Sequence, residues 1–185
     1  LPGQDPVHQI TIIPRGPAGG LTISLPEEDR MYQSRQELQE RICTCLGGRV
    51  AEELVLGDIS TGASNDLQTA TSIARSMVMK YGMSDRLGAI SYDSDQEVFI
   101  GRSYERTKSY SEQVAGTIDQ EVKNLIDRAY DQCRDILKKD SDKLQALADY
   151  LLANESITGQ QFANLMEGKP LGEASTTSLT DGFEE

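Results

Sequence analysis

The chain has 185 residues, of which 18 are Lys or Arg and 30 are Asp or Glu, so its formal net charge at pH 7 is −12. A negative field of this size repels nucleic-acid phosphates and anionic lipid, which argues against a nucleic-acid-binding protein. Hydrophobic residues make up 37% of the chain, with seven Tyr, three Phe and no Trp. A core must therefore rest on Leu, Ile, Val and Ala, which favours packed helices over a β-sandwich.

The three cysteines, Cys43, Cys45 and Cys133, form neither a disulfide framework nor a Cys-x-x-Cys zinc motif. We expect them to be small buried residues in a reducing compartment. No apolar run has the length of a membrane span and no signal peptide opens the chain, so we expect this segment to be soluble. The sequence begins at Leu1 without an initiator Met, and we interpret it as a segment of a longer protein.

Two short strands are the first predicted elements. Residues 8–14 are rich in β-branched side chains, residues 15–20 are rich in Gly and Pro, and residues 21–25 alternate apolar with polar. This pattern predicts a β-hairpin with a glycine-rich connection that ends at Pro26.

Apolar residues at helical spacing predict helices at 34–55, 64–82, 111–138, 141–153 and 158–167. Capping boxes open the first at Ser34 and the last at Thr158, and Ser64 is the expected N-cap of the second. Gly57 is the expected C-cap of the first helix.

Gly47 and Gly48 lie inside the first predicted helix. Each costs about 1 kcal/mol relative to Ala in a helix interior. Because such a cost is usually offset by close backbone contact, we expect another element to cross the helix there.

Two stretches carry no helical pattern. Periodicity fades between residues 84 and 106, which predicts a mobile loop with one anchored segment at 98–101. After Gly168 the chain has few apolar residues and cannot bury enough surface to offset chain entropy. We therefore predict a mainly α domain at residues 1–167, with a small N-terminal β-hairpin or sheet, and a disordered acidic tail at 168–185.

Asp66 is the residue with the clearest potential for chemistry. It lies in the first turn of the second predicted helix, beside Asn65 and after a loop that contains Gly62. An acidic residue at this position gains about 0.3–1 kcal/mol from the helix dipole, so a purely structural role is the simpler explanation from these residues alone.

Three stretches resemble the peptidase domain of the FtsH family in order and spacing. They are Val-His-Gln-Ile-Thr-Ile-Ile-Pro-Arg-Gly at 7–16, Leu-Gly-Gly-Arg-Val-Ala-Glu-Glu-Leu at 46–54 and Thr-Gly-Ala-Ser-Asn-Asp-Leu at 61–67. Segments 81–84 and 99–102 also match. The resemblance covers residues 1–167, and it identifies the chain as similar to FtsH-type ATP-dependent zinc metalloproteases.

The resemblance implies a mostly helical, homo-hexameric peptidase domain that follows membrane helices and an ATPase module using ATP and Mg²⁺. It implies a zinc ion held by the two histidines of a His-Glu-x-x-His helix and by a carboxylate, for which Asp66 is the matching position. The Glu of that helix is the general base, and zinc lowers the pKa of its bound water and polarises the scissile carbonyl. The implied substrates are membrane proteins and misfolded or unfolded proteins, degraded at the cytoplasmic face of a bacterial cell membrane.

The chain departs from the family pattern at the zinc helix. Its only histidine is His8, in the first predicted strand, and it contains no His-Glu-x-x-His. In the family this helix lies just before a Leu-Pro-Gly-like turn, and this sequence begins with Leu-Pro-Gly. We therefore expect truncation to explain the absence, and we expect the isolated chain to be inactive, with no catalytic residue of its own.

Other candidate residues follow from the same resemblance. Glu52 and Glu53 are the runner-up carboxylates, expected to form helix salt bridges or to hydrogen-bond a zinc histidine. The predicted substrate-binding edge strand comprises Gly19, Gly20, Leu21 and Thr22. Backbone pairing at a sheet edge tolerates many substrate sequences, but an ordinary hairpin strand is an equal alternative.

Two further functions stay open at this point. In a non-catalytic paralogue, this domain would only assemble or gate a hexamer, and Asp66 would be a helix-start residue. A free helical interaction module would show the same helices and the same acidic surface.

Overall fold

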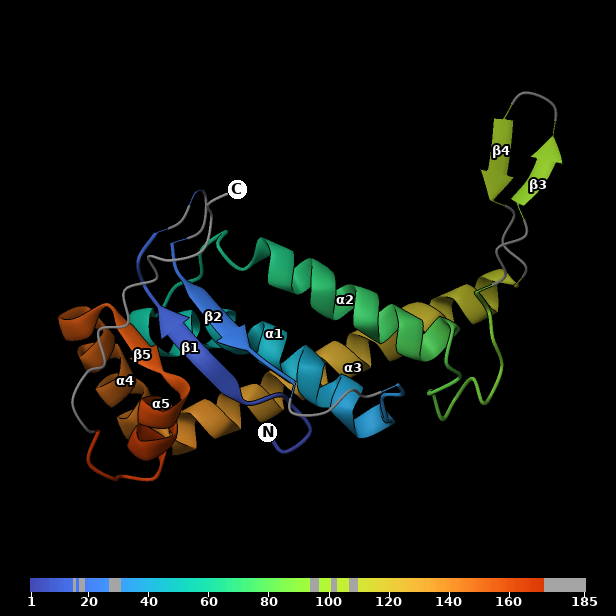
Figure 1. The fold of residues 1–185 in the computed structure, drawn as a ribbon. Helices are drawn as coiled ribbons and strands as arrows, with labels where there is room; N and C mark the ends of the chain where they lie inside the picture. Colours follow the sequence, from blue (N-terminus) through green and yellow to red (C-terminus); the bar gives the residue numbers. More distant parts are fainter. Residues whose placement is uncertain are drawn as a thin grey trace. The chain divides into compact units, whose positions relative to one another are not determined.

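The computed structural model describes residues 1–14, 16, 19–26, 31–93, 97–100, 103–106 and 110–171. The helices there are α1 (Arg35–Leu56), α2 (Ser64–Met79), α3 (Glu112–Lys139), α4 (Ser141–Asn154) and α5 (Gly159–Met166). The strands there are β1 (Val7–Thr11), β2 (Leu21–Ser24), β3 (Glu97–Ile100), β4 (Ser103–Arg106) and β5 (Ser156–Thr158). The predicted class, mainly α with a small sheet that includes the N-terminal hairpin, is confirmed (Figure 1).

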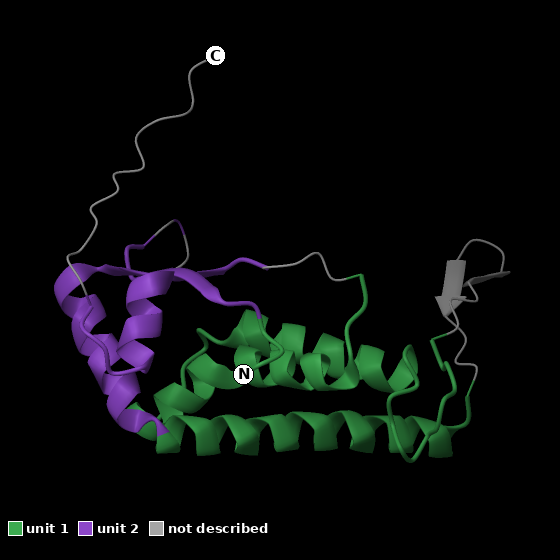
Figure 2. Ribbon diagram, turned by 60° about the horizontal axis from the view of Figure 1, so that its bottom comes forward, with its two compact units in different colours: residues 1–4, 30–139 green, residues 5–29, 140–185 purple. Residues whose placement is uncertain are grey.

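The chain divides into two compact units (Figure 2). The first comprises Leu1–Gln4 and Arg30–Lys139, and the second comprises Asp5–Asp29 and Asp140–Glu185. Residues 172–185, most of the predicted acidic tail, lie outside the described residues, so the limits 1–167 and 168–185 stay a prediction. No helix in the described ranges is long and apolar enough to cross a bilayer.

The core of the first unit lies between α1, α2 and α3, which pack on one another. The largest fully buried side chains there are Ile42, Leu46, Val50, Met77 and Val78. Burial of one Leu, Ile, Val or Met side chain stabilises a fold by about 1.5–3 kcal/mol. Cys43 and Cys133 are buried free thiols, as predicted, whereas Cys45 is only half-buried.

Both ends of α1 follow the local sequence. The Ser34 hydroxyl accepts a hydrogen bond from the Glu37 amide, and the Glu37 carboxylate accepts one from the Ser34 amide at 2.6 Å. At the other end Gly57 adopts a left-handed conformation with φ 69°, which favours glycine because it has no Cβ. The predicted capping box and C-cap glycine are therefore confirmed.

Two predictions about α1 and α2 are wrong. The N-cap of α2 is Ala63, which offers no side-chain cap, and Ser64 is already the first helical residue. A Cβ built on Gly47 or Gly48 meets nothing within 4 Å in the part of the chain that the structure describes. No described element therefore crosses α1 closely at these glycines, and the space beside them is open.

The second unit contains a three-stranded antiparallel sheet with strand order β2-β1-β5. Ile10 of β1 lies opposite Thr22 of β2 and opposite Ile157 of β5, and Ile157 is only 1% exposed. The sequence pattern missed β5, which has only three residues. The predicted capping box at Thr158 is confirmed, since its side chain accepts from the Gln161 amide and opens α5.

The segment between α2 and α3 differs from its prediction. Residues 85–93 form no helix or strand, as predicted, but β3 and β4 pair as an antiparallel hairpin where a loop was expected, with Val98 opposite Glu105 and Phe99 opposite Tyr104. The expected mobility of the segment stays a prediction. Residues 94–96, 101–102 and 107–109 lie outside the described residues, and so does part of the predicted anchored segment.

Candidate functional site

Asp66 is the third residue of α2 and is exposed. Its carboxylate makes no hydrogen bond or ion pair with any residue that the structure describes. The first amides of α2 have no side-chain cap, because the N-cap is Ala63. An exposed acidic group in this first turn suits the partial positive charge of the helix end, and it stays available to bind a ligand.

Cys45 lies within electrostatic reach of Asp66. Burial raises the pKa of the Cys45 thiol, and the negative charge of Asp66 raises it further. The two residues belong to α1 and α2, which pack on each other in the first unit. The sequence pattern did not indicate this pair, because the two residues lie on different helices.

Glu52 holds the loop that precedes α2. Its Oε2 accepts a hydrogen bond from the Ser60 amide at 3.0 Å, and its Oε1 accepts one from the Ser60 hydroxyl at 2.7 Å. Ser60 Oγ in turn accepts a hydrogen bond from the Gly62 amide at 3.1 Å. The bond from the Ser60 amide, followed by that from its hydroxyl, lowers the pKa of the Glu52 carboxyl.

Glu53 faces α3 instead. The Tyr130 hydroxyl donates a short hydrogen bond to Glu53 Oε2, and Arg134 Nη2 lies 3.5 Å from Glu53 Oε1. The Arg134 guanidinium also lies over the Tyr130 ring, 5.1 Å from its centroid. The bond from Tyr130 lowers the pKa of Glu53, and the same bond raises the pKa of Tyr130. Glu53 therefore ties α1 to α3.

The described residues provide one candidate zinc ligand and not a complete set. Within them, no three His, Cys, Asp or Glu side chains come together to hold a metal ion. Catalytic zinc takes three protein ligands and keeps one position open for water. Asp66 fits this chemistry as an oxygen donor, and His8 is an exposed residue of β1 in the second unit. No complete zinc site can be built from these residues alone.

The predicted substrate-binding residues lie at the edge of the sheet. Leu21 and Thr22 open β2, whose outer edge faces no described strand because the order is β2-β1-β5. A Cβ on Gly20 would lie 2.8 Å from the Thr11 carbonyl oxygen, whereas one on Gly19 would meet nothing within 4 Å of it in the described residues. Gly20 therefore permits close approach to β1, and Leu21 is 44% exposed.

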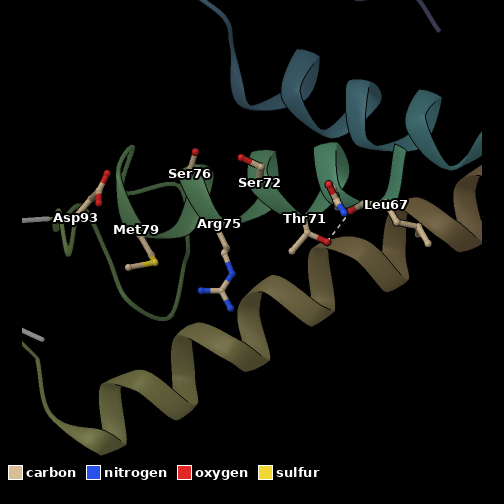
Figure 3. Close-up of a pocket in the computed structure, with 8 residues that line it drawn as sticks. Leu67, Thr71, Ser72, Arg75, Ser76, Met79 and Asp93 are labelled. Atoms are coloured by element: carbon tan, nitrogen blue, oxygen red, sulfur yellow. Dashed lines mark hydrogen bonds between the residues drawn. The ribbon is translucent and has the colours of Figure 1, made fainter. Parts of the chain in front are cut away.

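An open groove of about 700 Å³ runs along α2 (Figure 3). It is lined by Leu67, Gln68, Thr71, Ser72, Arg75, Ser76, Met79 and Asp93. Arg75 points toward α3, where its Nη2 lies 3.8 Å from Asp119 Oδ1. Sequence reasoning did not identify this groove, whose charged lining residues are Arg75 and Asp93.

Comparison with known proteins agrees with the resemblance drawn from the sequence. The sequence profile of peptidase family M41 matches residues 1–165. The ATP-dependent zinc metalloprotease FtsH 1 of Thermoanaerobacter sp. (strain X514) is 50% identical over 172 residues, which cover 92% of this chain and 28% of that protein. The ATP-dependent zinc metalloprotease FtsH of Bacillus subtilis (strain 168) is 44% identical over 171 residues, which cover 91% of this chain and 27% of that protein.

A third relative is the ATP-dependent zinc metalloprotease FtsH 2 of Alkaliphilus metalliredigens (strain QYMF), 52% identical over 166 residues. The match covers 89% of this chain and 24% of that protein. The chain thus spans about a quarter of the length of these relatives. Since the family profile matches nearly all of its described residues, this chain belongs to peptidase family M41.

Proposed function

We propose that this chain is the part of an ATP-dependent zinc endopeptidase that supplies the third zinc ligand, Asp66, and a strand that binds substrate. The observation that carries the proposal is that the carboxylate of Asp66 is exposed and makes no hydrogen bond to the described residues. The residue lies in the first turn of α2, and the chain belongs to peptidase family M41.

In this proposal the two zinc histidines and the general base come from parts of the whole protein other than this chain. Bound zinc supplies an activated water and polarises the scissile carbonyl. The role of this chain is to hold the Asp66 carboxylate at the start of a packed helix. The chain alone is accordingly proposed to be inactive.

The outer edge of β2, which faces no other strand among the described residues, supports the proposed substrate strand. An extended peptide adds to a sheet edge through backbone hydrogen bonds, which are largely independent of its sequence. Such binding suits an enzyme that degrades membrane proteins and misfolded or unfolded proteins. The whole protein is proposed to be a homo-hexamer that uses ATP and Mg²⁺ at the cytoplasmic face of a bacterial membrane.

The substitution Asp66→Asn in the whole protein tests the proposal. We expect zinc binding and casein degradation to be lost, while ATP hydrolysis and assembly stay close to wild type. Asp135→Asn is the matched control, because Asp135 is an exposed residue of α3 with no hydrogen bond to the residues described. Unchanged proteolysis in the Asp66 variant would show that Asp66 is only a helix-start residue.

The same measurements separate the enzyme from a non-catalytic paralogue that only assembles or gates a hexamer. Bound zinc and casein turnover in the wild-type whole protein exclude the paralogue. A folded hexamer with neither property supports it.

A further inference from the structure

Cys43 and Cys133 are two buried free thiols on different helices of the first unit. Cys43 lies on α1 and is 2% exposed, whereas Cys133 lies on α3 and is 5% exposed. Both belong to the core cluster in which α1 and α3 pack on each other. A single buried cysteine is adequately explained as a small apolar side chain. A pair in one core brings a further possibility, because two thiols can react with each other.

The two thiols are in direct contact. A hydrogen bond joins the side chains of Cys43 and Cys133, which lie far apart in the sequence and are brought together by the packing of α1 on α3. Because a thiol is only a weak hydrogen-bond donor and acceptor, the bond adds little to the stability of the core. Its chemical consequence is that two sulfur atoms are held side by side.

The hydrogen bond makes the two thiols unequal. The bond from Cys133 lowers the pKa of the Cys43 thiol, and the same bond, followed by burial, raises the pKa of Cys133. The thiolate is the nucleophilic form of cysteine. Cys43 is therefore the thiol suited to attack an oxidant, and Cys133 stays protonated beside it, in the place of a resolving thiol.

Cys45 provides a comparison within the same helix. It lies two residues from Cys43 and is half-buried, so it is the most exposed of the three thiols. Burial, followed by the negative charge of Asp66, raises the pKa of Cys45. If exposure alone decided reactivity, Cys45 would be oxidised first. Contact with a second thiol favours Cys43 instead.

We propose that Cys43 and Cys133 are a site of oxidative modification, at which a peroxide converts the two thiols to a disulfide that joins α1 to α3. In the first step the Cys43 sulfur attacks one oxygen of hydrogen peroxide and the O–O bond breaks. One water leaves with the thiol proton, and Cys43 becomes a sulfenic acid. In the second step the Cys133 sulfur attacks the Cys43 sulfur, the S–O bond breaks, and the oxygen leaves as a second water with the Cys133 proton. The two thiols lose two electrons, and one hydrogen peroxide is reduced to two waters.

The disulfide changes the first unit in a defined way. It brings the two sulfur atoms to about 2.05 Å, a closer approach than a hydrogen bond, so the side chains or the helices must shift to accommodate it. It also closes a long loop of chain that runs from α1 through α2 to α3, which restricts the unfolded chain. This inference goes beyond the proposed function and is independent of the zinc site.

The test treats the whole protein with hydrogen peroxide and maps its cysteines by mass spectrometry after alkylation under denaturing conditions. We expect a linked pair of peptides that carry Cys43 and Cys133, lighter than the separate peptides by two hydrogen atoms and released by dithiothreitol. Cys45 should be recovered as an alkylated thiol. Amide hydrogen exchange in α1 and α3 should slow by about tenfold or more in the oxidised protein, as expected for a disulfide that closes a long loop.

Single substitutions separate the two roles. In Cys133→Ala, Cys43 should stop at the sulfenic acid, which dimedone traps, whereas in Cys43→Ala, Cys133 should remain a thiol. The matched control Cys45→Ala should form the linked peptides as readily as the wild type. If a variant of the buried pair does not fold, the wild type and Cys45→Ala still decide the question. Oxidation of Cys45 before Cys43, or recovery of Cys43 and Cys133 without the linked peptides, overturns the inference.

Discussion

Leu46 offers a direct test of how the core of the first unit is built. It lies in the middle of α1, is 1% exposed, and packs in the cluster shared with α2 and α3. Replacement by Ala removes three carbon atoms, worth about 2.4 kcal/mol at roughly 0.8 kcal/mol per buried methylene. A residual cavity adds to this, so we expect the free energy of unfolding to fall by about 3 kcal/mol, within the range of 2–5 kcal/mol typical of such substitutions.

The matched control is Leu56→Ala at the end of the same helix. Leu56 is 72% exposed, so the same change in chemistry should alter the free energy of unfolding by no more than about 0.5 kcal/mol. Urea titrations followed by circular dichroism give both values from the transition midpoints and slopes. Equal losses in the two variants would show that Leu46 is not buried between α1, α2 and α3.

Three further substitutions test the pH dependence of stability and the packing around two glycines. The Tyr130 hydrogen bond lowers the pKa of Glu53. The bond therefore contributes fully to the free energy of unfolding above the unfolded pKa of Glu53, about 4.3. This contribution is lost as the pH falls through the lower pKa of Glu53 in the folded protein. The difference in unfolding free energy between wild type and Tyr130→Phe should therefore shrink below about pH 4.3, and a difference that is constant down to pH 2 contradicts the assignment. Gly159→Ala should destabilise by about 1–3 kcal/mol, because its Cβ would lie 2.2 Å from the Val7 carbonyl oxygen. Gly47→Ala should instead stabilise the isolated chain by up to about 1 kcal/mol, since its Cβ meets nothing within 4 Å in the described residues; thermal melts that give both the same sign would refute this.

Local signals in the sequence predicted much of the fold. The capping boxes at Ser34 and Thr158 and the C-cap Gly57 lie within a few residues of the groups they satisfy, so their spacing can be read directly. Ser64 misled because a Ser at the first helical position looks like an N-cap. The short strand β5 was missed because its pairing with β1 joins residues almost 150 positions apart.

The sequence likewise predicted one part of the candidate site and not the other. The place of Asp66 in a first helical turn followed from the sequence, and its expected role followed from resemblance to a family. The partners of the neighbouring carboxylates did not follow, because Glu52 meets Ser60 across a loop and Glu53 meets Tyr130 from a different helix. Two adjacent glutamates on one helix therefore serve different contacts, which no spacing rule distinguishes.

The outer edge of β2, which pairs with no strand that the structure describes, has a consequence for the behaviour of the isolated chain in solution. An exposed strand edge can pair with the same strand of another copy, which is a common route to aggregation. The net charge of −12 opposes such association by mutual repulsion. At physiological ionic strength, salt largely screens repulsion between charges more than about 8 Å apart. The chain should therefore stay dispersed in buffer of low ionic strength and self-associate as the salt concentration rises.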